Sequence, residues 1–305
     1  MQQPVEVTFP SDGDTCRAWH FAAQTGLLTA YKRTPCIVMG HGFGATRDAG
    51  LLPYARQFAA NGFHVLVFDY RHFGASDGEP RQIISVERQL QDWAAAVEFA
   101  RGMPGIDSAR VALWGTSFSG GLVIETACND RRVAAIVAQC PALDGVSMLT
   151  NYISYAGVLS GLKLLLAGIT DKFGALLRRP PKLLPIIGPP GSLAFLSTPD
   201  SEPGYRAIAP AGWRNEVAAR ISLELPFFRP VLRIPELSCP SLLQLCEQDQ
   251  VAPPRLPPAI LERAKRFRPT VRRYNCGHFD IYLGEWFEKS VADQIAFLTR
   301  ALATP

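Results

Sequence analysis

The sequence predicts an α/β fold in which helices cover both faces of a mostly parallel sheet, and three observations support this prediction. Short continuous apolar runs, typical of strands buried on both faces, alternate with longer segments whose apolar residues recur at helical spacing. Hydrophobic residues make up 48% of the 305 residues and charged residues 19%, which excludes a disordered chain. Loops rich in glycine and serine directly follow two of the apolar runs, where an α/β sheet places its functional side chains.

The expected elements follow from these two periodicities. We expect strands at residues 5–9, 18–22, 36–39, 64–69, 111–114, 133–139, 241–246 and 270–274. We expect helices at residues 52–61, 86–101, 120–128, 258–267 and 286–301. Between the predicted strands that end at residue 139 and those that begin at residue 241, the alternation of strand and helix patterns stops, which indicates an insertion.

The insertion spans residues 144–235. Strand and helix patterns stop alternating there, and 11 of the chain's 25 prolines gather in its last two thirds. Residues 148–177 are apolar and helix-like, and residues 212–223 also have a helical pattern. The sequence therefore predicts an α/β core, formed by residues 1–143 and 236–305, with a lid (cap) inserted between its two parts.

Charge and cysteine content narrow the classes of partner. The formal net charge of +4 is too small and too evenly spread to predict nucleic-acid binding. Seven cysteines without a paired CxxC motif predict neither a disulfide framework nor a zinc site, and suit a reducing compartment. The beginning of the chain lacks a signal-peptide pattern, and the apolar stretch at residues 157–169 is too short to span a membrane. We expect a cytoplasmic protein without a membrane span; its oligomeric state is open, with a homodimer as one option.

The central motif is the stretch WGTSFSGG at residues 114–121, which follows a predicted strand and opens a predicted helix. This context is typical of a nucleophile elbow, a sharp turn that lifts a serine above the sheet. The turn needs small residues two positions before and after the nucleophile, and Gly115 and Ser119 flank Ser117 in this way. A turn of small residues without a catalytic role would have the same pattern.

A second motif, GHGFG at residues 40–44, follows another predicted strand. The backbone N–H of Phe43, together with that of Phe118 at the start of the next helix, would form an oxyanion hole. The alternative is an ordinary turn between a strand and a loop.

A serine nucleophile needs a base, and the sequence has five histidines. His20 and His64 belong to predicted strands, His41 to the glycine-rich loop and His72 to another loop. His278 follows the last predicted strand, so a parallel sheet would bring it to the same edge as the elbow. His278 is therefore the candidate base.

The candidate acid that orients the base is Asp249, which follows the predicted strand at residues 241–246. Asp144 is the main alternative, because it follows another strand. Asp69, Asp280 and Glu247 are further alternatives.

The order Ser117, Asp249, His278, each after a predicted strand, resembles that of the α/β-hydrolase superfamily over nearly the whole chain. The stretches HGFG, FDYRHFGASDG and GTSFSGG are similar to those of the bacterial serine esterase and dienelactone-hydrolase-like branch, and of fungal polyketide transferases. The resemblance implies an eight-stranded core, a lid at the usual position, and a loop at residues 69–78 packed near the elbow. Ser117 replaces the cysteine of true dienelactone hydrolases and the aspartate of epoxide and haloalkane hydrolases, which argues against those substrates.

These inferences predict a serine hydrolase that cleaves small-molecule carboxylic esters through an acyl-enzyme, without metal or cofactor. Ser117 would attack, His278 would act as base and acid, and Asp249 would orient it. The apolar lid favours an apolar acyl group. A thioesterase or a polyketide-transferase-like acyltransferase would use the same triad, and a non-catalytic binding protein on this fold is the remaining alternative.

Overall fold

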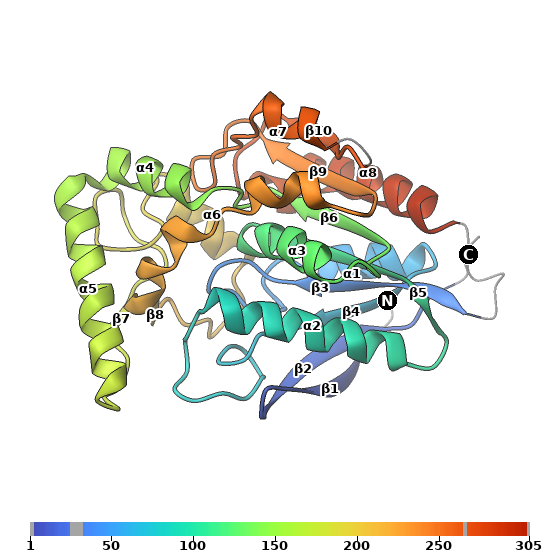
Figure 1. Cartoon of the computed structure of the whole chain (residues 1–305), viewed down its shortest axis with the longest axis horizontal. Coiled ribbons are helices and arrows are strands. Elements are labelled where there is room, and N and C mark those ends of the chain that lie inside the picture. Colours follow the sequence, from blue (N-terminus) through green and yellow to red (C-terminus); the bar gives the residue numbers. More distant parts are fainter. Residues whose placement is uncertain (1–2, 25–32, 265–266, 304–305) are drawn as a thin grey trace.

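The computed structural model describes residues 3–24, 33–264 and 267–303, and its main feature is an eight-stranded sheet (Figure 1). The strands lie in the order β1-β2-β4-β3-β5-β6-β9-β10. Their bounds are β1 Val5–Ser11, β2 Asp14–Phe21, β3 Thr34–Gly40, β4 His64–Phe68, β5 Ile106–Thr116, β6 Ala135–Gln139, β9 Ser241–Cys246 and β10 Thr270–Tyr274. β2 is antiparallel to both of its neighbours, and every other pair is parallel. The predicted mostly parallel, eight-stranded sheet is confirmed.

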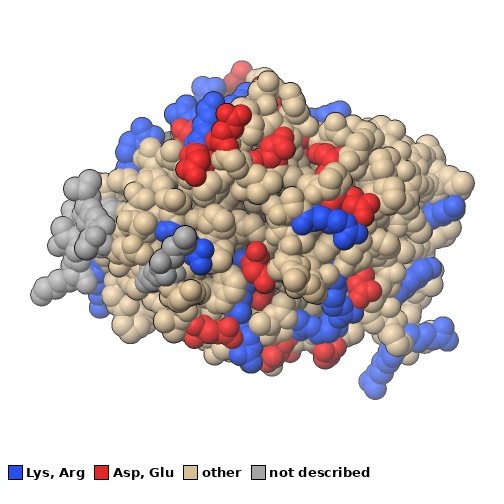
Figure 2. Space-filling view, turned by 180° about the vertical axis from the view of Figure 1, so that it is seen from behind, with Lys and Arg blue, Asp and Glu red and all other residues tan. Residues whose placement is uncertain are grey.

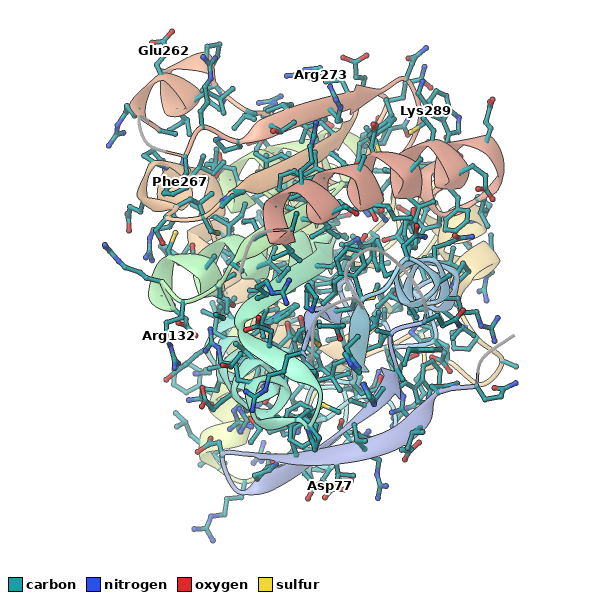
Figure 3. The ribbon with its side chains drawn as sticks, turned by 90° about the vertical axis from the view of Figure 1, so that its right-hand side faces the viewer. Asp77, Arg132, Glu262, Phe267, Arg273 and Lys289 are labelled. Carbon is teal, nitrogen blue, oxygen red and sulfur yellow. The ribbon has the colours of Figure 1, made fainter. Side chains whose placement is uncertain are left out.

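The five helices predicted for the core are present, whereas the helix at residues 201–208 is not predicted from the sequence. Their bounds are α1 Leu52–Ala60, α2 Val86–Gly102, α3 Phe118–Asn129, α4 Gly145–Ala156, α5 Val158–Leu176, α6 Ser201–Ile208, α7 Pro258–Arg263 and α8 Gly284–Leu302. α7 is shorter than the predicted helix at residues 258–267, of which residues 265 and 266 lie outside the described residues. Figure 3, seen from the end where the chain termini lie, shows α8 beside β10, with Lys289 on the helix and Arg273 on the strand.

Strand β3 shows how the continuous apolar runs work. All of its residues are buried, because helices cover both faces of the sheet. Cys36 and Val38 join the core under α2 and α3, whereas Ile37 and Met39 point the other way, into the core under α1 and α8. Since successive side chains alternate between the faces, one apolar run supplies two cores.

The segment at residues 144–235 lies beyond the ends at which the parallel strands finish (Figure 1). It contains α4, α5 and α6 and a small two-stranded sheet of β7, Leu183–Leu184, and β8, Val217–Ala218. None of its residues joins the eight-stranded sheet. This placement suits a lid, and the division into core and lid stays a prediction. Within the described residues, no helix is both long enough and apolar enough to cross a bilayer.

The prediction of a helix at residues 212–223 is wrong. Strand β8 occupies Val217–Ala218 and pairs with β7, and a 3₁₀ helix, Ala219–Leu223, follows it. The physical reason is Asp171 on α5, whose carboxylate accepts hydrogen bonds from the backbone N–H and the guanidinium of Arg220. These tertiary contacts outweigh the weak local preference for a regular helix.

Charged side chains of both signs are interspersed over most of the face seen in Figure 2. The distribution fits the small net charge of the chain. The exception is the end of the molecule formed by α5, where the coloured side chains are basic.

Candidate active site

The turn between β5 and α3 holds Ser117 in a backbone conformation that few residues adopt. Its φ is 55°, in the left-handed region, and its ψ is −117°. The Ser117 N–H donates to the carbonyl of Gln139 at 2.9 Å, and the Ser117 carbonyl accepts from the N–H groups of Gly120 and Ala142, each at 2.9 Å. A Cβ on Gly115 would collide with the carbonyl of Ser119, so only glycine fits there. The turn has the geometry expected of a nucleophile elbow.

Ser119 does more than fit a crowded turn. Its buried hydroxyl donates to the carbonyl oxygen of His41 and contacts the hydroxyl of Tyr70. The indole of Trp93 in turn donates to the Tyr70 hydroxyl at 2.7 Å. A glycine could not make these contacts, so Ser119 ties the elbow to the loop that begins at Gly40. Sequence reasoning treated it only as a small residue, because a distant partner such as Tyr70 leaves no local signal.

The structure brings Ser117, His278 and Asp249 together in one hydrogen-bonded chain. His278 Nδ1 donates to Asp249 Oδ2 at 2.6 Å, and His278 Nε2 lies 3.0 Å from Ser117 Oγ. Because the carboxylate can only accept, the proton of a neutral imidazole sits on Nδ1, and Nε2 accepts from the serine hydroxyl. This is the tautomer that a base needs when it removes a proton from Ser117.

Asp249 is itself held in place from the other side. Its Oδ1 accepts hydrogen bonds from the N–H groups of Val251 and Ala252, at 2.9 and 2.7 Å. These bonds fix the carboxylate while Oδ2 remains directed at His278. The loop after β9 therefore fixes the orientation of the Asp249 carboxylate toward His278.

The environment of His278 favours its charged form. The ring is buried, and burial alone would lower its pKa, but the charges of Asp249 and Cys140 and the hydrogen bond with Asp249 raise the pKa of His278 above its usual range. A more distant carboxylate, that of Asp200, acts in the same direction. Asp200 and Cys140 were not singled out from the sequence, because each comes from a segment remote from His278 along the chain.

The alternative acids occupy other positions. Asp144 caps α4 and forms an ion pair with Arg229 at 2.7 Å. Asp280 accepts from the N–H of Gly277 at 2.7 Å, and Asp69 accepts from the N–H of Arg47 at 2.7 Å. Glu247 lies 3.9 Å from Arg273. The carboxylate that accepts a hydrogen bond from the His278 imidazole is that of Asp249.

The other histidines also have structural partners. His20 and His64 form a hydrogen bond with each other at 3.0 Å between neighbouring strands. His72 bonds to the carbonyl of Pro80 at 3.0 Å, and its backbone has a φ of 71°. His41 Nδ1 donates to the Gly42 carbonyl at 3.1 Å.

The glycine-rich loop at residues 40–44 lies against the elbow. A Cβ added to Gly42 would lie 3.2 Å from the Ser117 Cβ, so the two backbones approach closely. The rings of Phe43 and Phe118 pack edge to face, with centroids 5.6 Å apart. Within the described part of the chain, no hydrogen bond uses the backbone N–H of Phe43 or of Phe118. Both donors are therefore free for a substrate oxygen.

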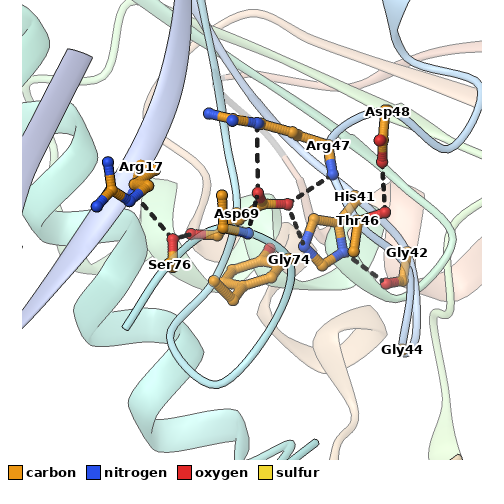
Figure 4. Close-up of polar contacts among 12 residues, drawn as sticks. Arg17, His41, Gly42, Gly44, Thr46, Arg47, Asp48, Asp69, Gly74 and Ser76 are labelled. Carbon is orange, nitrogen blue, oxygen red and sulfur yellow. Dashed lines mark hydrogen bonds and ion pairs between the residues drawn. The ribbon is translucent and has the colours of Figure 1, made fainter. Parts of the chain in front are cut away.

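Asp69 holds two neighbouring loops together (Figure 4). It accepts from the N–H of Arg47 at 2.7 Å and from that of Ala75 at 3.0 Å, and the Arg47 guanidinium lies 3.3 Å away. Burial raises the pKa of Asp69 to about 6, and burial lowers the pKa of the nearby His41 to about 4. The loop that begins at Asp69 thus packs near the elbow, as the resemblance implied, and its contacts are structural.

Two pockets meet at Ser117. The larger has about 830 Å³ of empty space when its opening to solvent is included, and residues that line it include Phe118, Met148, Tyr152 and Phe195. The smaller has about 330 Å³ of empty space, and Gly42, Ile208, His278 and Phe279 are among its lining residues. Ser117 and Phe43 line both. The serine hydroxyl therefore sits between a large space under α4 and a compact space beside the imidazole.

Two hydroxyls in the wall of the larger pocket lack partners. Within the described residues, neither Tyr152 Oη nor Ser197 Oγ has a hydrogen-bond partner, and both side chains are buried. Burial also raises the pKa of Tyr152. A buried hydroxyl without a partner is costly, so the wall of this pocket contains two polar groups that the described residues leave unpaired. The described residues contain no cluster of three or more His, Cys, Asp or Glu suited to a metal ion.

Known proteins share both the sequence and the fold. Residues 28–181, just over half of the chain, match the Peptidase S15 family, described as X-Pro dipeptidyl-peptidase. The chain is 40% identical over 303 residues to the quorum-quenching protein AidA of Acinetobacter baumannii, which covers 98% of this chain and 95% of that protein. It is 27% identical over 297 residues to the polyketide transferase ATR5 of Stachybotrys chlorohalonatus, over 95% of both chains.

A solved structure extends the likeness to three dimensions. The α/β-hydrolase GrgF from a Penicillium species superposes with a TM-score of 0.79 at 26% identity, over 99% of this chain and 100% of that chain. This likeness confirms the predicted α/β-hydrolase fold.

Proposed function

The chain belongs to the Peptidase S15 family and is an α/β-hydrolase-type enzyme, and on this premise we propose that it is a serine hydrolase that cleaves carboxylic esters. The observation that carries the proposal is the hydrogen-bonded chain from Ser117 through His278 to Asp249, with distances of 3.0 and 2.6 Å. Such a chain activates a serine that would otherwise be a poor nucleophile.

The reaction follows from the positions of these groups. Ser117 Oγ attacks the ester carbonyl while His278 Nε2 takes its proton, and the N–H groups of Phe43 and Phe118 stabilise the oxyanion. His278 returns the proton to the leaving alcohol, which leaves an acyl group on Ser117. Water, deprotonated by His278, then attacks the acyl carbonyl; the bond to Ser117 Oγ breaks, His278 returns the proton to Ser117 Oγ, and the acid leaves. Asp249 stabilises the imidazolium in both steps.

We assign the two halves of the proposed ester to the two pockets. The leaving alcohol must reach the proton on His278, and His278 lines the smaller pocket. The alcohol portion therefore occupies the smaller pocket, and the acyl portion occupies the larger one. The walls of the larger pocket are mostly apolar, which favours an apolar acyl group.

The hydroxyls of Tyr152 and Ser197 add a preference within that apolar space. An acyl chain with an oxygen part-way along its length would pair them and remove the cost of their burial. We therefore propose an acyl group that is apolar overall and carries a hydroxyl or carbonyl oxygen.

Residues 144–235 would act as the lid, since α4 and the loop around Phe195 form much of the acyl pocket. We also place the enzyme in the cytoplasm, because all seven cysteines are free thiols, which suits a reducing compartment.

A second candidate is acyl transfer or thioester hydrolysis by the same triad. The observation that favours it is the similarity to a protein named a polyketide transferase over 95% of both chains. In that case a substrate hydroxyl, rather than water, would take the acyl group from Ser117, or a thiol would be the leaving group.

A labelling experiment and a substrate panel test the proposal. A fluorophosphonate probe should label the protein and fail to label Ser117→Ala. The panel contains p-nitrophenyl esters of increasing chain length, the matching thioesters, and an X-Pro p-nitroanilide, since the family is described by X-Pro dipeptidyl-peptidase activity. We expect turnover of the esters; labelling without ester turnover, or turnover of the anilide alone, would contradict the proposal.

A further inference from the structure

Helix α5 exposes a stripe of large apolar side chains to solvent. Leu159 is 65% exposed, Phe173 64% and Leu176 73%. The α5 stripe, as we call it, consists of Val158, Leu159, Leu162, Leu165, Leu166, Ile169, Phe173 and Leu176. At about 100° per residue, these positions fall on one side of the helix. Figure 1 shows α5 at the left-hand edge of the molecule, away from the sheet.

The opposite side of α5 faces the rest of the protein and is built of smaller residues. Leu164, Ala167, Gly168 and Asp171 are its buried positions. Gly168 lies against the 3₁₀ helix at Ala219–Leu223, where a Cβ would collide with the Ser222 hydroxyl. The helix therefore turns its small residues inward and most of its leucines outward, the reverse of the usual arrangement.

Basic residues border the stripe. The helical period places Lys163 along one edge and Lys172 along the other, and Arg178 and Arg179 follow the end of the helix. All four are exposed. The only acidic residue between Asp144 and Asp200 is Asp171, which is buried in its ion pair with Arg220. At the right-hand edge of Figure 2, the end formed by α5, the coloured side chains are accordingly basic.

We propose that the α5 stripe docks the protein on a membrane surface that contains anionic lipid. An apolar face bordered by lysines is the pattern of helices that lie in the interface plane, with apolar side chains among the acyl chains and cations at the headgroups. The absence of an exposed acidic residue on α5 complements a negative surface.

A second copy of the chain fits the stripe less well. A two-fold dimer through α5 would bring the same face together from both subunits. The lysines and arginines of each copy would then meet those of the other, and α5 offers no exposed carboxylate to pair with them. The charge of the face therefore favours lipid over self-association.

The larger pocket, proposed to hold the acyl group, lies next to α5, the helix that carries the stripe. Leu149 and Tyr155 of α4 line the larger pocket and are also exposed, and α4 packs beside α5. If the proposed function holds, an apolar substrate dissolved in the bilayer would enter from the docked side. The docking itself does not require the triad.

Co-sedimentation of the full chain with lipid vesicles tests the proposal. We expect the protein to pellet with vesicles of phosphatidylcholine and phosphatidylglycerol in equal parts at low salt. Pelleting should fall with phosphatidylcholine alone and at about 0.5 M salt, which screens the cations. The variant Lys163→Glu/Lys172→Glu should bind roughly tenfold or more weakly, and Leu162→Ser/Leu166→Ser should bind more weakly on both kinds of vesicle.

The control places the same charge change on a part of the molecule away from α5. Arg273→Glu/Lys289→Glu lies on β10 and α8, which Figure 1 shows away from α5, and should pellet like the wild type. All variants should keep the wild-type thermal midpoint and, if the proposed function holds, its rate on a soluble p-nitrophenyl ester. No pelleting with anionic vesicles, equal loss in the control, or a wild-type dimer in sedimentation velocity that the α5 variants abolish would each overturn the proposal.

Discussion

The core and the segment at residues 144–235 hold their functional side chains in different ways. In the core, Asp249 and His278 are 7% and 2% exposed, and each makes specific hydrogen bonds. In the inserted segment, the buried hydroxyls of Tyr152 and Ser197 have no partner within the described residues. In the core, the hydrogen bonds among these side chains are already made. In the segment, the two hydroxyls would find hydrogen-bond partners only when a substrate binds.

This difference suggests how the two regions divide their tasks. In the proposed function the preorganised core acts on the reacting atoms, so changes there should lower the rate for every ester. In the same proposal the segment contacts only the acyl portion, so changes there should alter which ester is preferred. The variants below test this division, from the largest expected effect to the smallest.

Ser117→Ala should lower kcat by roughly 10⁴–10⁶ on every ester of a chain-length panel, because no other group can take the acyl portion. The thermal midpoint should stay close to that of the wild type, as a small side chain is lost. His278→Ala should fall to a similar level, since the two residues act as one unit. A variant of Ser117 that retained a tenth of the wild-type rate would refute its role as nucleophile.

Asp249→Asn should lower kcat on the order of 10⁴ for all esters, because the imidazole would lose the tautomer that the carboxylate imposes. The pH profile offers a second readout. The carboxylate keeps the pKa of His278 above its usual value despite burial, and in the proposed reaction the neutral ring is the base. In the wild type, kcat/KM should therefore rise with pH through a midpoint above about 6.5. In Asp249→Asn the residual activity should rise at lower pH, and an unchanged midpoint would show that another group sets it.

Tyr152→Phe tests the segment. The change removes only the hydroxyl, so kcat/KM for an ester with an oxygen along its acyl chain should fall about tenfold. The value for the plain alkyl ester of the same length should change little. Ser197→Ala is the matching variant for the second hydroxyl. An equal fall on both esters would place Tyr152 with the core residues and break the proposed division.

Asp144→Asn should have the smallest effect. Asp144 pairs with Arg229 near the surface at the start of α4, and exposed ion pairs of this kind contribute little. We expect kcat/KM within about twofold of the wild type on every ester, because Asn also caps a helix well. If this variant lost more activity than Asp249→Asn, the acid would have to be reassigned to the loop after β6.

Some features could be predicted from the sequence because their causes are local. The central strands β3, β4, β6 and β9 are buried on both faces, so their continuous apolar runs are enough to locate them. Parallel strands deliver their ends to one edge, so Ser117, Asp249 and His278 are expected to meet there, and their side chains do lie within hydrogen-bond distance. The small residues around Ser117 reflect a steric need of the turn itself.

Other features depend on which segments pack together, and periodicity does not carry that information. The contact of Ser119 with Tyr70, and the turn of residues 212–223 around Asp171, arise between segments distant in sequence. The apolar residues of α5 have the spacing of a core helix, yet most of them face solvent. The sequence by itself determined the sheet and the meeting of the candidate triad. Each strand's pattern of apolar residues lies within a few neighbouring residues, and parallel strands all end at the same edge of the sheet. Only the tertiary structure decided the two pockets and the exposed stripe of α5. Whether a helix face is buried depends on which other segment of the chain packs against it.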